Sequence, residues 1–467
     1  MGGAGEAAPH GLRLTRGPAL APQRTNGGAG AGSALYARRL VSPQPRIGTF
    51  IRWIAHACAI VVMACAVAAA RANDVSERRA AMQRLADHWR EAQLPDGSLP
   101  YGYDFLPDRP AEPDHSPWYY VVRQAGSLYM LVEYYRISGD ARLREASRRA
   151  IEALKAHSLP IGKSTLQRGV EATRIESLPF ARWRLQGMLD RMGLLYEPNG
   201  PDLVVSATRR YDQAHAGATA MALVALLAYE RATGDSSFVE LRGAWLRGLL
   251  DLRQPGGGFR ALPTTIETSD FYDGEAWFAL AVYADLHRED TALARELAAI
   301  DDVMMTRYGP APTPGFHHWG SMAAAQRYGT TGDRRFVDFL RSQTENYFEH
   351  HAKKLDPAEN NCPEVEGFAS ALAALDKAGE RDTPLARRTR EWLAREARTV
   401  LRLQIAPGQT GLRFDGSARL DAPRMADFAG TFLLGLYDPR TRVDMDMHCL
   451  SALAIIEREG VLQRSPE

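Results

Sequence analysis

Residues 269–286 limit the folds open to this chain more than any other stretch. They begin with acidic and aromatic residues, Asp270, Tyr272 and Asp273, and continue as a helix that is apolar on nearly every side. Such a helix is usually buried in a protein core or in a membrane. Its apolar part, about 13 residues, is too short to span a bilayer. We therefore expect a core helix whose polar N-terminal end opens into a cavity.

Five other segments repeat this design of polar or aromatic residues followed by a small, apolar helix. The six segments are residues 124–135, 216–227, 269–286, 319–326, 366–375 and 447–456. Gly139, Gly234 and Gly332 follow three of them, each between a Ser or Thr and an Asp, and a looser version surrounds Gly379. The pattern is typical of a helix that ends at a left-handed glycine before an aspartate that caps the next helix.

The segments between the core helices predict helices of a second kind. Residues 385–401, for example, place Trp392, Leu393 and Val400 on one side among many arginines. Core helices that alternate with such one-sided helices indicate a closed ring of helical hairpins. Turn signals in residues 95–103, 256–259 and 411–416 predict short extended loop pieces, so we expect little strand. Residues 161–211 leave room for an insertion.

This arrangement resembles the (α/α)6 toroid superfamily over about residues 76–460. The superfamily includes six-hairpin glycoside hydrolases, toroidal polysaccharide lyases, glucuronyl epimerases, terpene cyclases, protein prenyltransferases and lanthionine cyclases. The resemblance is one of architecture and carries no individual residue over. It implies an all-α fold, an (α/α)6 barrel of helical hairpins with short extended loop segments.

The N-terminal region predicts export. Residues 1–49 are rich in Gly, Ala, Pro and Arg and indicate disorder or an over-long start. Residues 50–72 are typical of a signal peptide, with an apolar run that ends in Ala70-Arg71-Ala72, so the mature chain would begin at Asn73. An uncleaved membrane anchor is the alternative, and a lipoprotein signal at Cys65 is weaker. Residues 73–467 then form a single toroid domain in a periplasmic or secreted protein.

Cys362 and Cys449 remain after removal of the signal. An even pair in an oxidising compartment predicts one disulfide. Two alternatives stay open: two free thiols, or a zinc ion held with His448, as the zinc of lanthionine cyclases and prenyltransferases at the toroid mouth implies. No phosphate-binding glycine loop, His-Glu-x-x-His or Gly-x-Ser-x-Gly motif occurs, so we expect no cofactor. The formal net charge of +1 gives no support for nucleic acid as a partner. We expect membrane contact only through an uncleaved N-terminal segment.

If the inner helices start at one rim, the polar residues at those starts converge on one cavity, near helix N-termini that favour anionic or hydroxyl-rich ligands. Paired carboxyl groups suit general acid and base work on a glycosidic bond, and aromatic rings stack on sugars. The predicted catalytic residues are Asp273, Glu275, Glu364 and Glu366. The predicted substrate-binding residues are Tyr101, Tyr103, Trp118, Arg123, Tyr211, His215, Asp270, Tyr272, His317, His318, Trp319, Asp446 and His448. Helix capping alone also favours many of these residues at helix starts.

These residues predict an exported carbohydrate-active enzyme that hydrolyses a polysaccharide or oligosaccharide. A lyase or uronic-acid epimerase is the alternative, with a Tyr or His base and Arg123 on the substrate carboxylate. A non-catalytic glycan-binding or envelope scaffold protein and a zinc-dependent toroid enzyme are the other hypotheses. A fold alone does not choose among them.

Overall fold

The computed structural model describes residues 74–463, apart from 112–116, 167–168, 170–187, 190–195, 209, 255–256 and 415–417. The described residues belong to a compact unit formed by residues 65–467. The predicted disordered start and signal segment lie outside the described residues, and export stays a prediction. No helix among the described residues is long and apolar enough to cross a membrane.

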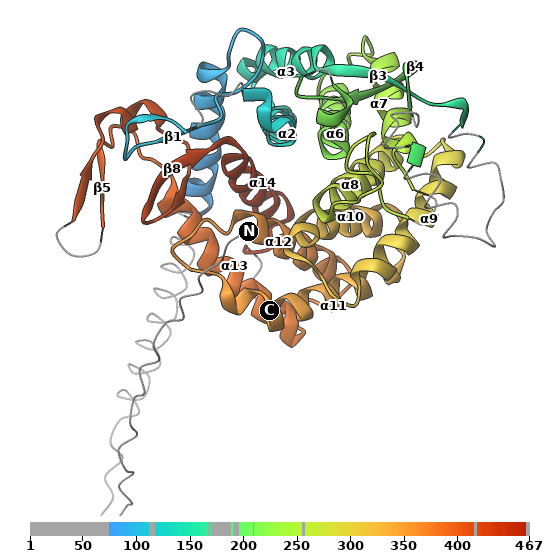
Figure 1. Cartoon of the computed structure of the whole chain (residues 1–467). Coiled ribbons are helices and arrows are strands. Elements are labelled where there is room, and N and C mark those ends of the chain that lie inside the picture. Colours follow the sequence, from blue (N-terminus) through green and yellow to red (C-terminus); the bar gives the residue numbers. More distant parts are fainter. Residues whose placement is uncertain are drawn as a thin grey trace, which may run out of the picture. The chain divides into compact units, whose positions relative to one another are not determined.

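Within the described residues, six helices form an inner ring. They are α2 (Val121–Ser138), α6 (Ala216–Thr233), α8 (Asp270–Leu286), α10 (Pro314–Thr331), α12 (Cys362–Lys377) and α14 (Val443–Glu459). Each packs against the next, and α14 packs against α2, so the ring closes (Figure 1). α6 buries every residue from Ala216 to Tyr229 because neighbours cover it on all sides. The predicted core segments are thus the inner helices, and the predicted (α/α)6 fold is confirmed.

The outer helices are amphipathic. They are residues 74–92, α3 (Arg144–Ala156), α7 (Val239–Asp251), α9 (Thr291–Tyr308), α11 (Arg334–His350) and α13 (Pro384–Leu403). α3, α7, α9, α11 and α13 each pack on the inner helix that precedes them. α13 buries Trp392, Leu393 and Val400 and exposes Arg388 and Arg395. One-sided burial of this kind requires a single apolar stripe, as the sequence predicts.

The predicted turns between inner and outer helices are confirmed. Gly139, Gly234 and Gly332 end α2, α6 and α10 with φ of 65°, 69° and 69°, a left-handed backbone that glycine adopts without strain. The side chains of Asp140 and Asp333 then accept hydrogen bonds from backbone N–H groups of the next helical turn.

The strands occupy loops that lead into inner helices. β1 (Gly102–Asp104) lies in a four-stranded antiparallel sheet of order β2-β1-β8-β7, with β2 (Arg109–Pro110), β7 (Leu433–Gly435) and β8 (Asp438–Arg442). Tyr103 pairs with Thr441, which joins the loops before α2 and α14. β3 (Ser158–Lys163) pairs with β4 (Tyr196–Val205), and β5 (Gly411–Arg413) with β6 (Arg419–Asp421). The β3–β4 pair lies in the region that the sequence indicated only as an insertion. Short 3-10 helices are η1 (Pro117–Tyr120), η2 (Ala141–Leu143), η3 (Tyr211–Gln213), η4 (Ala352–Lys354) and η5 (Pro423–Phe428).

Side chains in the first turns of inner helices hold these loops. In four of the described hairpins, such a side chain accepts a hydrogen bond from a loop backbone N–H. The pairs are Leu99 with Gln124 (2.8 Å), Val205 with Thr219 (2.9 Å), Phe259 with Asp273 (2.7 Å) and Phe432 with Asp446 (2.6 Å). Because a buried N–H without a partner is costly, these contacts fix each loop to its helix.

Cys362, at the start of α12, forms a disulfide with Cys449 of α14. The predicted disulfide is confirmed. The alternatives with free thiols or with a cysteine-bound zinc ion are wrong, because the disulfide uses both thiols. The bond joins the two helices that carry Glu366 and His448.

Candidate functional site

The inner helices begin at the same end of the ring, because their first turns contact one another. Nε of Arg123 in α2 lies 3.3 Å from Oδ2 of Asp444 in α14. The hydroxyl of Tyr272 in α8 lies 3.0 Å from Nδ1 of His215, the residue before α6. The polar starts that the sequence predicts to converge are therefore close together.

Helical periodicity shows which of these side chains face the ring interior. A cavity at the other end of the ring is lined by Phe278, Met322, Ser370 and Ser451, among others, so these residues mark the interior faces of α8, α10, α12 and α14. Residues three or four positions earlier lie on the same faces, one turn nearer the helix starts. They are Glu275, His318, Glu366 and His448. We call these four residues the N-terminal cluster.

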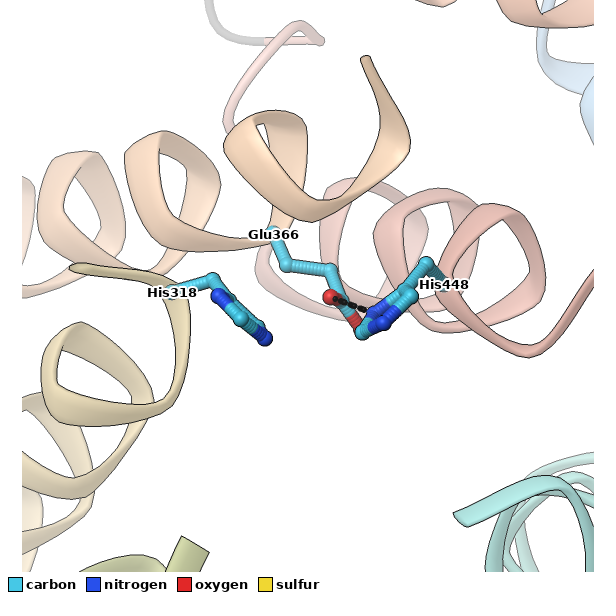
Figure 2. Close-up of side chains that lie close together, drawn as sticks. All are labelled: His318, Glu366 and His448. Carbon is cyan, nitrogen blue, oxygen red and sulfur yellow. Dashed lines mark hydrogen bonds and ion pairs between the residues drawn. The ribbon is translucent and has the colours of Figure 1, made fainter. Parts of the chain in front are cut away.

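Three members of the cluster lie together. Nδ1 of His448 is 2.6 Å from Oε2 of Glu366, and the ring of His318 is 5.1 Å from that of His448, centroid to centroid (Figure 2). His318 and Glu366 are fully buried, and the His448 side chain is 12% exposed. The two imidazoles thus meet edge to face, with ring planes 82° apart, beside one carboxylate.

The two imidazoles differ in charge. Burial tends to lower the pKa of His448, but the carboxylate of Glu366 opposes this and raises the pKa overall, so His448 favours the cation. Burial lowers the pKa of His318 well below its ordinary value, and His448 lowers it further. His318 is therefore neutral beside a positively charged neighbour. For Glu366 itself, burial raises the pKa, and His448 offsets part of that effect.

The tautomer of His318 follows from its contacts. Its ring forms a hydrogen bond with the backbone of Pro314. Nε2 has no hydrogen-bond partner among the described residues, so the bonded nitrogen is Nδ1. A neutral imidazole that donates through Nδ1 keeps a lone pair on Nε2. In the trio, this nitrogen and Oε1 of Glu366 are buried acceptors without a hydrogen-bond donor among the described residues.

Glu275, the fourth member, is a buried neutral acid. Burial raises its pKa well above the ordinary value, and its Oε2 has no hydrogen-bond partner among the described residues. The carboxyl group lies against Gly217 of α6, where any Cβ would overlap Oε2. Gly217 is the second residue of α6. A glycine is needed at this position because the Glu275 side chain occupies the space that a larger residue would fill.

Aromatic rings surround the cluster. Trp319 is buried, 6.0 Å from Phe278 and 5.9 Å from His448 between ring centroids. Phe271 is 51% exposed and meets His318 edge to face at 6.2 Å. Burial raises the pKa of Tyr272 to about 12, so its hydroxyl stays protonated.

Arg123 forms a second group at the same end. Its guanidinium lies 4.7 Å from the ring centroid of Tyr120 and hydrogen-bonds the hydroxyl of Tyr101. Arg442 binds both carboxylate oxygens of Asp444, at 2.6 and 2.9 Å. Asp444 lies one helical turn before His448, which links this group to the cluster.

Two predicted acids point elsewhere. Asp273 receives hydrogen bonds from the backbone of Phe259 and from the outer-helix residues Arg307 (2.9 Å) and Tyr308 (2.7 Å). Asp446 receives the backbone N–H of Phe432. Both carboxyl groups are buried against loops, and the contacts give them an anchoring role away from the trio.

The other predicted residues lie around the cluster or behind it. Glu364 accepts a hydrogen bond from Tyr347 of α11 (3.2 Å), and burial raises its pKa. His317 packs between Tyr347 and Phe368, and burial lowers its pKa to about 3.

Four of the predicted substrate-binding residues, three aromatic and one acidic, make contacts with other parts of the protein. Trp118 is buried and stacks on His157 at 3.7 Å. Tyr103 packs on Phe105 and Phe428. The hydroxyls of Tyr211 and Tyr308 bind the backbone oxygen of Pro160 and the carboxylate of Asp270, respectively.

Several residues that lie at this end were not predicted from the sequence. Tyr120, Phe271 and Arg442 have no motif that separates them from other surface residues. Only the ring closure and the β1–β8 pairing place them beside the cluster.

Among the described residues, one group of His, Cys, Asp and Glu side chains is close enough to hold a metal ion. It is His318, Glu366 and His448, whose candidate ligand atoms lie within 4.8 Å of one another. However, Nδ1 of His448 and Oε2 of Glu366 are 2.6 Å apart. Two ligands of a tetrahedral zinc ion lie about 3.4 Å apart. The trio is arranged as a hydrogen-bonded ion pair with a facing imidazole, and a metal would have to separate that pair.

Solved structures of other proteins have a fold similar to that of this chain. The chain is similar to a sugar epimerase from a ruminal bacterium (TM-score 0.52, 13% identity, 81% of this chain and 98% of that chain). It is also similar to an inactive variant of an α-1,6-mannanase of Salegentibacter sp. HEL1_6 in complex with α-1,6-mannotetrose (TM-score 0.51, 11% identity, 81% and 98%). An unsaturated glucuronyl hydrolase specific for heparin gives a TM-score of 0.50 at 12% identity, with 82% and 98% covered. No protein-family model and no curated protein sequence matches the chain. At these identities the likeness establishes the (α/α)6 toroid fold.

Proposed function

We propose that this chain is a carbohydrate-active enzyme that moves a proton on a sugar carbon next to a carbonyl group. This is the chemistry of sugar epimerases and polysaccharide lyases. The observation that carries the proposal is the pair of adjacent imidazoles beside Glu366, of which His318 favours the neutral form and His448 the cation. Groups whose environments push their pKa values apart are suited to act as base and acid. The same fold occurs in a sugar epimerase and in glycoside hydrolases, so it accommodates this reaction class without selecting it.

The proposed step starts at Nε2 of His318. This nitrogen removes the proton from the carbon beside the carbonyl group, and the C–H electron pair moves onto the carbonyl oxygen as an enolate forms. His448 then returns a proton to the opposite face of that carbon, and the electron pair moves back from the oxygen. His318 ends as the cation and His448 as the neutral base, and exchange with water restores both. If the β C–O bond breaks in place of the proton return to carbon, the enolate electron pair forms the C=C bond of an unsaturated lyase product. The leaving oxygen then takes the C–O electron pair and the proton of His448.

Neighbouring side chains have defined roles in this proposal. Glu366 holds His448 as a cation and fixes its ring orientation. Glu275, a neutral acid with an unpartnered oxygen, can donate a hydrogen bond to the developing enolate. Phe271, which is half exposed beside His318, offers a face for the sugar ring.

The test is exchange with solvent. The purified mature chain is incubated in D2O with a panel of uronic and neutral oligosaccharides, and ¹H and ²H NMR follow each carbon. We expect one of two outcomes: one deuterium at the carbon beside the carbonyl group with inverted configuration, or loss of the hydrogen from that carbon with an ultraviolet-absorbing double bond. Release of reducing ends with every sugar C–H bond intact would contradict the proposal, and so would a panel that shows no reaction.

Hydrolysis is the second candidate, favoured by Glu275. A carboxyl group kept protonated by burial is suited to protonate a glycosidic oxygen, and a carboxylate on the same interior face, Glu366, would be its partner. Against this, Glu366 is already bound to His448. In the same assay, a hydrolase would release reducing ends and leave every sugar C–H bond intact.

We also propose that the protein acts after export, in the periplasm or outside the cell. The residues of the predicted signal and the buried Cys362–Cys449 disulfide support this compartment, since such bonds persist in oxidising environments. N-terminal sequencing of the exported protein should begin at Asn73. A start upstream of residue 50 in the mature protein would contradict the proposal.

A further inference from the structure

Arg123 is placed to meet a ligand beside the N-terminal cluster. It lies seven residues before Met130, a residue of the opposite cavity, and therefore shares the interior face of α2. Its side chain is 35% exposed. Tyr101 and Tyr120, stacked at 4.9 Å, hold the guanidinium from one side.

The charges around Arg123 do not cancel. Asp444 is shared between two guanidinium groups, since it binds Arg442 through both oxygens and lies 3.3 Å from Nε of Arg123. One positive charge is left over. Glu366 and His448 offset each other, and burial favours the neutral forms of His318 and Glu275. The starts of six inner helices add partial positive charge at this end.

We propose that the ligand of this end carries a carboxylate, and that Arg123 binds it. The chemical class is a uronic acid residue within an oligosaccharide. This inference rests on the proposed function and makes it more specific, because the carbon whose proton moves is then the one next to the carboxylate. An arginine on the carboxylate stabilises the second negative charge that forms on it as the C–H proton leaves.

Two unpartnered atoms support a ligand at this position. Nε2 of His318 and Oε2 of Glu275 are buried and have no hydrogen-bond partners among the described residues. Asp444, which Arg123 contacts, lies one turn before His448 in α14. A carboxylate on Arg123 is therefore at the same end of the ring as the cluster, about one helical turn from His448.

The test compares two matched oligosaccharides. One is a uronic tetrasaccharide, and the other is its carboxyl-reduced form, in which CH2OH replaces each carboxylate. Binding is measured by titration calorimetry with the His318→Gln variant, which binds without reaction. We expect the acidic form to bind more tightly. Arg123→Gln should weaken binding of the acid on the order of tenfold to a hundredfold and leave binding of the reduced form nearly unchanged.

Arg231→Gln is the matched control, because Arg231 lines the cavity at the other end of the ring. It should leave both affinities unchanged. Equal affinity for the two oligosaccharides, equal losses in Arg123→Gln, or no binding of either would overturn the inference. Selective binding of the acid with neither deuterium incorporation nor an unsaturated product in the wild type would instead leave the inference standing and reject the proposed reaction.

Discussion

The two ends of the ring differ in how their polar groups are satisfied. The end where the inner helices finish holds a cavity of about 400 Å³ and several ion pairs, among them Glu133 with Arg136 at 2.6 Å and Lys377 with Glu459 at 2.8 Å. Oε1 of Glu230 and Oδ2 of Asp376, buried there without hydrogen-bond partners among the described residues, belong to carboxylates whose other oxygen binds an arginine. The end where they start leaves Nε2 of His318 and Oε2 of Glu275 without partners in the described chain.

This difference shows that size does not locate the site. Basic side chains at helix C-termini offset the partial negative charge of the helix ends, so the charges around the cavity have a structural explanation. A buried polar atom without a partner is costly and needs another explanation, such as a ligand or a chemical role. We therefore place the site at the N-terminal cluster. Four variants test this placement against the cavity at the other end.

The largest effect is expected for His318→Gln. Removal of the proposed base should lower the deuterium-exchange rate on the order of 10²–10⁴-fold, with an unchanged circular dichroism spectrum. His317→Gln is the control, because that neighbouring histidine packs behind the cluster on Tyr347. A loss in His317→Gln as large as that in His318→Gln would contradict the assignment.

Glu366→Gln should lower the rate on the order of 10–100-fold and change its pH dependence. The pKa of His448 is raised by Glu366 on α12, with smaller contributions from Asp444 and Glu364, and lowered by burial. Activity that needs His448 protonated is present below its raised pKa and lost as pH rises through it. Without the Glu366 charge this loss moves to lower pH. An alkaline limb that stays in place in the pH–rate profile would show that another group titrates.

Gly217→Ala should destabilise the fold by about 1–3 kcal/mol and displace the Glu275 carboxyl group, because the new methyl group overlaps Oε2. Thermal unfolding and the exchange rate measure the two effects. Gly329→Ala in α10 is the control, since a Cβ there meets no atom within 4 Å. That helical change should stabilise the protein by about 0.5–1 kcal/mol. Equal behaviour of the two variants would refute the packing argument.

The smallest effect is expected at the other end. Lys377→Met removes a pair whose lysine is 55% exposed, so it should cost less than about 1 kcal/mol in unfolding free energy. The exchange rate should be unchanged. A tenfold slower deuterium-exchange rate in Lys377→Met would indicate that the active site lies at the cavity end.

The sequence predicted the ring because its signals are local. An apolar helix, a left-handed glycine and a capping aspartate, as at Gly332 and Asp333, depend on nearby residues and recur with each hairpin. The disulfide was predicted because two cysteines remain after the signal and an exported protein meets an oxidising compartment. The β3–β4 pair was missed because its strands show no clear alternation in sequence.

The direction in which each polar side chain points could not be predicted from such local signals. Asp273 and Glu275 are two residues apart, which places them about 200° apart around a helix. Only the closure of the ring shows that Glu275 shares the interior face with Phe278, while Asp273 turns to Arg307 and Tyr308. The partnership of His448 with Glu366 joins residues 82 positions apart and has no local signal.

The protonation states of the two histidines can be measured by nitrogen-15 NMR of histidine-labelled protein at pH 7, with His318→Gln and His448→Gln variants to assign the two rings. We expect a neutral His318 with its proton on Nδ1 and a doubly protonated His448. Two rings in the same protonation state, or a His318 protonated on Nε2, would contradict the proposed roles of the two histidines.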